Sequence, residues 1–154
     1  MLWNVISTLA LGLWFGGGVV AGFVAPQAAF GVLTDRQVAG SIAGAVLSRY
    51  ALIAIASGIA YCGAWFGASG GSRPYARVTL ILVVIALLVV CFSQFVLTPK
   101  IADLRAEMRA GGETPELQGR FGAYHRWSVI LFAMQWLLVS AALVRHSMRP
   151  TSRT

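Results

Sequence analysis

The strongest constraint on this chain is a set of four long apolar stretches separated by polar breaks. Each stretch is close to the about 20 residues that an α-helix needs to cross the hydrocarbon core of a bilayer. Only 11% of the 154 residues are charged, whereas soluble domains carry about a quarter. The sequence therefore predicts an all-α integral membrane protein, a four-helix bundle that forms one domain over residues 1–154.

The polar breaks divide the chain into spans, a loop and a tail. Residues 99–120 form an exposed loop, in which residues 100–110 alternate apolar and charged side chains. That pattern predicts a short amphipathic helix on the membrane surface or capping the bundle, between the third and fourth spans. A basic tail, residues 145–154, ends the chain. The expected membrane spans are residues 5–28, 48–67, 77–98 and 123–144.

Turn and capping residues predict where the helices begin and end. Pro26 should kink or end the first helix near the interface, and Pro99 should close the third, because proline has no backbone donor. Thr114-Pro115-Glu116 has the pattern of an N-cap, a first-turn proline and an acid near the positive helix end. The fourth helix should therefore begin well before the bilayer.

Successive helix ends alternate between the two sides of a membrane, so polar residues from all four helices should meet on one side. The last helix carries a single stripe of Phe121, His125, Ser128, Phe132 and Gln135, which can face Gln94 and Thr98 on the third helix. Polar residues in apolar helices are costly unless paired. The expected polar cluster is His125, Ser128, Arg126, Tyr124, Gln94, Thr98, Gln27 and Arg49.

Two interpretations of this cluster stay open. Interhelical hydrogen bonds from Gln, Ser and His commonly hold helices in register, and Arg49 is most simply an interfacial anchor. Alternatively, the cluster handles a ligand, a proton or a metal, for which His125 is the only candidate ligand. One histidine gives poor zinc coordination. No Ser-His-Asp set is present, because every acid lies outside the spans, and a non-enzymatic role is favoured.

Several short motifs share their order and spacing with a known family. They are Leu13-Trp14-Phe15-Gly16-Gly17, Ala25-Pro26 with Phe30, Ala39-Gly40, Thr98-Pro99 with Ile101, and Phe121 with His125 and Ser128. Over nearly its whole length the chain resembles the transmembrane-protein-205-like family, a membrane domain of unknown function. The resemblance implies a four-helix fold and a structural role for the motif residues Pro26, Phe30, Pro99 and Phe121.

The layout of that family is similar to copper-resistance-D-like four-helix proteins, some of which bind haem. Those proteins carry a histidine in the first helix, and this chain has none there. We therefore expect no cofactor. The alternative is a haem- or copper-dependent redox or metal-handling protein that uses His125.

Glycine spacing and charge placement indicate partners and location. Gly12/Gly16 and Gly18/Gly22 form small-residue faces that let another helix approach, which favours a homo-oligomer or a membrane partner. The basic residues flank apolar runs, so lipid phosphate is the expected partner and nucleic acid is not. We expect a multi-pass bacterial inner-membrane protein with both termini cytoplasmic, although strict Lys/Arg counting favours the opposite orientation. The expected function is oligomerisation or the handling of a partner or solute.

Overall fold

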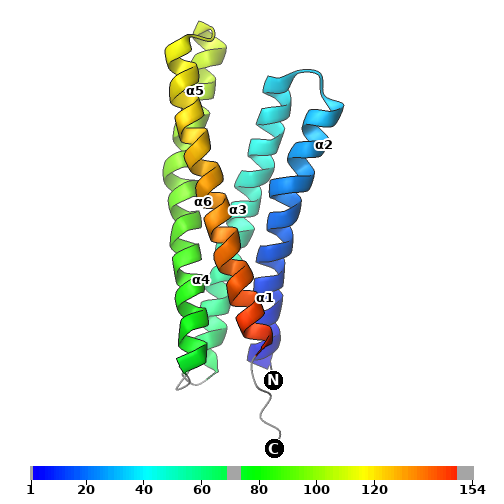
Figure 1. Cartoon of the computed structure of the whole chain (residues 1–154), viewed down its shortest axis with the longest axis vertical. Coiled ribbons are helices and arrows are strands. Elements are labelled where there is room, and N and C mark those ends of the chain that lie inside the picture. Colours follow the sequence, from blue (N-terminus) through cyan, green and yellow to red (C-terminus); the bar gives the residue numbers. More distant parts are fainter. Residues whose placement is uncertain (1, 69–73, 149–154) are drawn as a thin grey trace, which may run out of the picture.

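The structure, a computed structural model, describes residues 2–68 and 74–148. Within these ranges the chain forms helices and no strand. Four long helical segments run alternately up and down (Figure 1), and each is long and apolar enough to cross a membrane. The predicted all-α four-helix membrane bundle is confirmed.

Two of the four segments are single helices, and two change their helical type along their length. The single helices are α3 (Arg36–Gly67) and α6 (Pro115–Ser147). The first segment consists of α1 (Leu2–Val19), the π-helix η1 (Val20–Val24) and α2 (Ala25–Val32). The third consists of α4 (Pro74–Phe92), the π-helix η2 (Ser93–Leu97) and α5 (Thr98–Gly111).

Each π-helix lies directly before a proline. Pro26 and Pro99 are the second residues of α2 and α5, and in an α-helix each ring would clash with the carbonyl four residues earlier. The wider turn removes this conflict: the Ala25 amide donates to the Val20 carbonyl, and the Thr98 amide donates to the Ser93 carbonyl. The prediction that Pro99 closes the third helix is wrong, and Pro26 does not end the first.

The segment expected as a surface helix is present as α5, but it continues the third segment and packs along α6. Gly112, with a φ of +82°, follows it. The start of α6 agrees with the sequence. The Thr114 hydroxyl accepts a hydrogen bond from the Leu117 amide at 3.3 Å, and Pro115 and Glu116 occupy the first turn.

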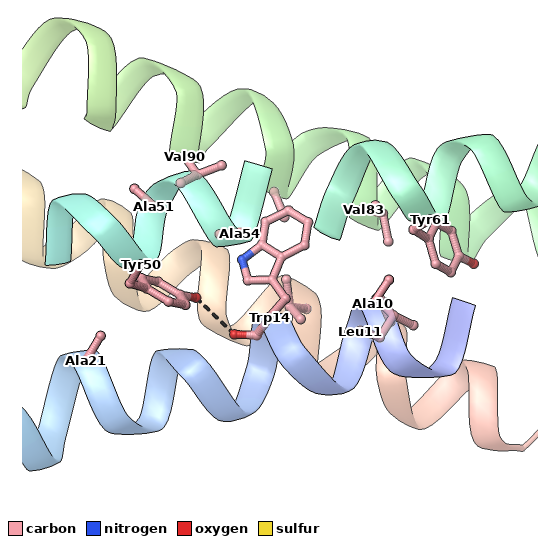
Figure 2. Close-up of a cluster of buried hydrophobic side chains, with 13 residues drawn as sticks. Ala10, Leu11, Trp14, Ala21, Tyr50, Ala51, Ala54, Tyr61, Val83 and Val90 are labelled. Carbon is pink, nitrogen blue, oxygen red and sulfur yellow. Dashed lines mark hydrogen bonds between the residues drawn. The ribbon is translucent and has the colours of Figure 1, made fainter. Parts of the chain in front are cut away.

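The core lies where all four segments meet, toward the end that holds the start of α1 and the end of α6. Figure 2 shows Trp14 of α1 among small and branched side chains from α3 and α4. Trp14 and Tyr61 are among the largest fully buried side chains. Gly58 makes this packing possible, because an added Cβ there would lie 2.8 Å from the Trp14 ring.

At the opposite end the segments separate into two pairs (Figure 1). α2 packs against α3, and α5 packs against α6. We call this end, formed by α2, the first turns of α3, α5 and the first turns of α6, the open end. The site described below lies between the two pairs.

Candidate functional site: a cavity between two helical pairs

A cavity of about 1060 Å³ lies at the open end, between the α2–α3 pair and the α5–α6 pair. Its volume is at the upper limit of small-molecule sites, which measure about 300–1,000 Å³. Residues from both π-helices border it, including Phe23 of η1 and Gln94 of η2. Single π-turns inside helices frequently occur at functional sites.

The space exists because one face of α3 carries mostly small side chains. The face repeats at three- and four-residue intervals, as expected for one stripe of a helix. The residues on it are Gly40, Ala43, Gly44, Leu47, Ser48 and Ala51, and all of them line the cavity. Ala39-Gly40 and Ala43-Gly44 form a small-residue face of the kind that lets helices pack closely, but in the structure Gly40 and Gly44 line the cavity. On the far side the Arg105 side chain reaches across, with Nη1 2.7 Å from where a Gly44 Cβ would be.

The lining changes from charged to apolar along the bundle. Arg36, Arg105, Arg109 and Glu113 line its outer end, whereas aromatic and aliphatic side chains such as Phe132 line its inner end. The sequence shows how this gradient relates to the bilayer. Residues 78–99 and residues 127–144 contain no charged side chain, so the inner end lies at hydrocarbon depth and the outer end lies beyond it.

Three side chains form a column along the wall made by α5 and α6. The guanidinium carbon of Arg105 lies 5.4 Å from the centre of the Phe121 ring. The Phe121 ring stacks on the His125 imidazole, with centroids 5.8 Å apart and planes inclined by 4°. One turn nearer the hydrocarbon, the Lys100 ammonium lies 5.7 Å from the centre of the Tyr124 ring. These cation–π contacts fasten α5 to α6.

The structure brings together half of the expected polar cluster. Gln94, Thr98, His125 and Ser128 line the cavity, and so do the remaining members of the predicted α6 stripe. Their hydroxyls do not join the helices, because Thr98 donates to the Ser93 carbonyl at 3.0 Å and Ser128 donates to the His125 carbonyl at 2.9 Å. The α6 stripe and the polar residues of η2 and α5 therefore line the same side of the cavity.

The other four members lie elsewhere. Gln27, Arg49 and Arg126 are exposed and do not line the cavity, and Tyr124 packs under Lys100. The exposure of Arg49 agrees with its interpretation as an interfacial anchor. Of the motif residues, Pro26, Phe30 and Phe121 line the cavity, and Pro99 is exposed.

Arg105 is the cavity residue that the sequence interpretation missed. It is half-buried and lines the outer end, whereas the sequence placed it on a short helix that lies on the membrane surface or caps the bundle. A signal for it exists, since the stripe of Gln94, Thr98 and Ile101 reaches Arg105 at the next helical interval. An expected helix end at Pro99 separates Arg105 from that stripe, whereas in the structure the helix continues through Pro99 into α5.

His146 is a second residue that sequence reasoning passed over. It is buried near the end of α6, with Nε2 3.1 Å from the Thr8 hydroxyl and its ring edge-on to Tyr61. By contrast, His125 is exposed. The two histidines are 21 residues apart on α6, or about 32 Å at 1.5 Å per residue, so they cannot ligate one metal within a single chain. Among residues 2–68 and 74–148, no group of three or more His, Cys, Asp or Glu side chains is placed to hold a metal ion.

Gln135 marks the inner end of the cavity. It is 4% exposed, and its Oε1 atom has no hydrogen-bond partner in the part of the chain that the structure describes. A buried amide oxygen without a partner destabilises a fold. A water molecule bound at the inner end would satisfy it.

Comparison with known proteins identifies the family. The sequence pattern of a domain of unknown function, DUF4149, matches residues 9–110, so the chain belongs to this family. No curated protein and no solved structure matches. The comparisons do not support the resemblance to the transmembrane-protein-205-like family or to copper-resistance-D-like proteins. The match includes the motifs from Leu13 to Ile101 and ends before Phe121 and His125. The chain is thus a multi-pass membrane protein of a family without an assigned function.

Proposed function

We propose that this protein is a non-enzymatic membrane protein that binds a largely apolar molecule in the cavity between the α2–α3 and α5–α6 pairs. The cavity itself carries the proposal, because it extends from charged residues outside the hydrocarbon to aromatic residues within it. Ligand sites are typically concave and mostly apolar, with a few polar groups that fix orientation. Binding of such a molecule in the cavity is the form of solute handling that we propose.

The carboxylate content of the cavity favours ligand binding over catalysis of hydrolysis. Among the described residues that line the cavity, Glu113 is the one carboxylate. Its two oxygens accept hydrogen bonds from Gln37 Nε2 at 2.6 Å and from Gln118 Nε2 at 2.7 Å. This carboxylate therefore links α3 to α6 across the open end, and each of its oxygens already accepts a hydrogen bond from a glutamine amide.

The cavity opens toward lipid. Phe23 and Phe30 on one side, and Val129 and Leu137 on the other, line it while being 49–62% exposed. Large apolar side chains that are this exposed belong in contact with hydrocarbon. A ligand can thus enter from the bilayer between the η1–α2 segment and α6.

A cavity-filling variant tests the proposal. Ser48→Phe places a ring in the cavity from the small face of α3, and Ala56→Phe adds the same ring to an exposed position of α3 that does not line the cavity. Native mass spectrometry of protein purified in mild detergent would measure the fraction that carries a bound small molecule. We expect adducts on the wild type and on Ala56→Phe and their loss from Ser48→Phe. Equal adducts on all three proteins, or none on the wild type, would overturn the proposal.

We also propose that the protein lies in the cell inner membrane with both termini cytoplasmic. The side with the termini carries five arginines at or beyond the ends of the spans and no acid: Arg73, Arg77, Arg145, Arg149 and Arg153. Strict Lys/Arg counting favours the other side, but much of that count lies on helix extensions or beside the acids of residues 100–120. We therefore keep the termini on the cytoplasmic side, and the open end would then face outward. A topology reporter fused after Thr154 should be active only in the cytoplasm, and extracytoplasmic activity would reverse the orientation.

The alternative proposal is a haem or copper centre on His125, and a bis-histidine centre there would need its second histidine from another molecule. The imidazole is exposed and stacked on Phe121, and the other histidine is about 32 Å away along the same helix. A second copy of the chain could supply that histidine, so a bis-histidine centre depends on the proposed homo-oligomer.

A further inference from the structure

We propose that the cavity holds an anionic phospholipid from the surrounding bilayer, with its phosphate on Arg105 and its acyl chains between α6 and the η1–α2 segment. This inference rests on the proposed binding function and names the class of ligand. The inference rests on Arg105. The relevant observations are the charges near its side chain, its depth in the bilayer and the apolar lining of the cavity next to it.

Arg105 is half-buried and lacks an anionic partner. Its guanidinium lies between the Gly44 backbone and the Phe121 ring. In the part of the chain that the structure describes, no carboxylate pairs with it, and the neighbouring Arg109 donates its Nε–H to the Arg105 carbonyl at 3.3 Å. A buried charge is costly unless it is paired. The planar guanidinium fork binds phosphate through two parallel hydrogen bonds, which makes phosphate a suitable partner.

The outer end as a whole attracts an anion. Three arginines line it (Arg36, Arg105 and Arg109) against one acid, Glu113, which already accepts two hydrogen bonds. These four side chains have a summed charge of +2. A headgroup with one net negative charge would therefore be held more strongly than a zwitterionic one of the same size.

The depth of Arg105 matches that of lipid phosphate. Lys100 is the first charged residue after the apolar part of the third segment, and Arg105 follows five residues later in α5, about 7.5 Å further along the axis. The headgroup layer on each side of the hydrocarbon core is about 5–8 Å thick. The guanidinium thus lies where the phosphates of one leaflet lie.

The cavity is long enough to hold a lipid of one leaflet. Along α6 its lining runs from Gln118 to Leu137, which is 19 residues or about 28 Å. Half of a complete bilayer measures about 20–22 Å. A free phosphate or a short carboxylate would leave the inner, aromatic part of this space empty, so a lipid with acyl chains is the ligand that fits both ends.

Lipid titration of delipidated protein provides the test. Native mass spectrometry would compare phosphatidylglycerol with phosphatidylcholine of identical acyl chains, for the wild type and for Arg105→Gln. The control is Arg126→Gln, which removes an exposed arginine on the same side of the bundle that does not line the cavity. We expect the wild type and Arg126→Gln to prefer phosphatidylglycerol by about tenfold or more, as hydrogen bonds to a charged group allow. Arg105→Gln should lose this preference while still binding both lipids, and Arg105→Lys should keep part of it.

The outcomes separate the inference from the function on which it rests. Equal binding of both lipids by the wild type, or an unchanged preference in Arg105→Gln, would overturn the anionic headgroup site and leave apolar binding intact. Binding that is insensitive to Ser48→Phe would overturn the cavity as the binding site itself. Inorganic phosphate that displaces phosphatidylglycerol at equal concentration would show a site for free anions and contradict the lipid assignment. A shared elution volume and helical circular dichroism would confirm that the variants are folded.

Discussion

The Tyr50 hydroxyl donates a hydrogen bond to the Trp14 carbonyl at 3.0 Å and joins α3 to α1 at the inner end of the cavity (Figure 2). Tyr50 is buried, lines the cavity and contacts Phe132 edge-on. Between this contact and the end that holds the start of α1, all four segments pack together. Between the contact and the open end, they form two pairs. The hydrogen bond therefore marks the boundary between the packed core and the open end.

Loss of that hydrogen bond should weaken the fold moderately. We expect Tyr50→Phe to lower the free energy of unfolding by about 0.5–1.5 kcal/mol, the usual contribution of such a bond. Tyr124→Phe is the control, because that ring contacts Lys100 through its face and keeps the contact without the hydroxyl. Detergent-induced unfolding followed by circular dichroism would measure both. A Tyr50→Phe protein as stable as the wild type would contradict a structural role for the bond.

The glycines of α1 should separate into two classes on substitution. A Cβ at Gly18 would lie 2.9 Å from Trp136 Cδ1 and from the Tyr50 hydroxyl oxygen, whereas a Cβ at Gly12 meets nothing within 4 Å. Overpacking costs about 1–3 kcal/mol, so Gly18→Ala should destabilise the protein by that amount. Gly12→Ala should be neutral or slightly stabilising, since it removes a flexible residue from a helix. Equal effects of the two substitutions in the same unfolding assay would show that Gly18 is not packed as described.

Gly12 and Gly16 remain free to contact another chain, because neither meets a neighbour within 4 Å. The proposed homo-oligomer should therefore depend on them, since close helix approach requires small residues. We expect the wild type to be an oligomer in lipid nanodiscs and Gly12→Leu/Gly16→Leu to be a monomer, as measured by mass photometry or native mass spectrometry. A monomeric wild type would refute the oligomer.

His125 should be dispensable for folding and should carry no chromophore. Its ring is exposed and contacts Phe121 within the same helix. We expect purified protein to lack a Soret band and stoichiometric copper, and we expect His125→Ala to unfold as the wild type does. A visible spectrum that disappears in His125→Ala would instead favour the redox alternative.

The features that depend on local sequence pattern could be predicted from the sequence. Apolar runs predicted four helices long enough to cross a membrane, and Thr114-Pro115-Glu116 predicted the start of α6. The α6 stripe from Phe121 to Gln135 was also predicted, because helical periodicity alone determines which residues share a face. In the structure each member of that stripe lines the cavity.

The features that depend on tertiary geometry could not be predicted in this way. A proline normally signals the end of a helix, and only the π-turns before Pro26 and Pro99 show that both segments continue. The cavity depends on how far the two helical pairs diverge, which no single segment encodes. Gly40 and Gly44 illustrate the limit: a small-residue face permits close helix packing or an open space, and the partner helix decides which one forms.

Photocrosslinking in membranes tests the binding cavity most directly. Phosphatidylglycerol that carries a diazirine on one acyl chain would be irradiated with the protein, and the labelled residues would be mapped by peptide mass spectrometry. We predict labels on the cavity residues Ser48 and Phe132 that exceed those on Leu52, which is 55% exposed and does not line the cavity. Labels confined to outward-facing residues such as Leu52 would contradict the account, because the acyl chain would then be touching only the outer surface of the bundle.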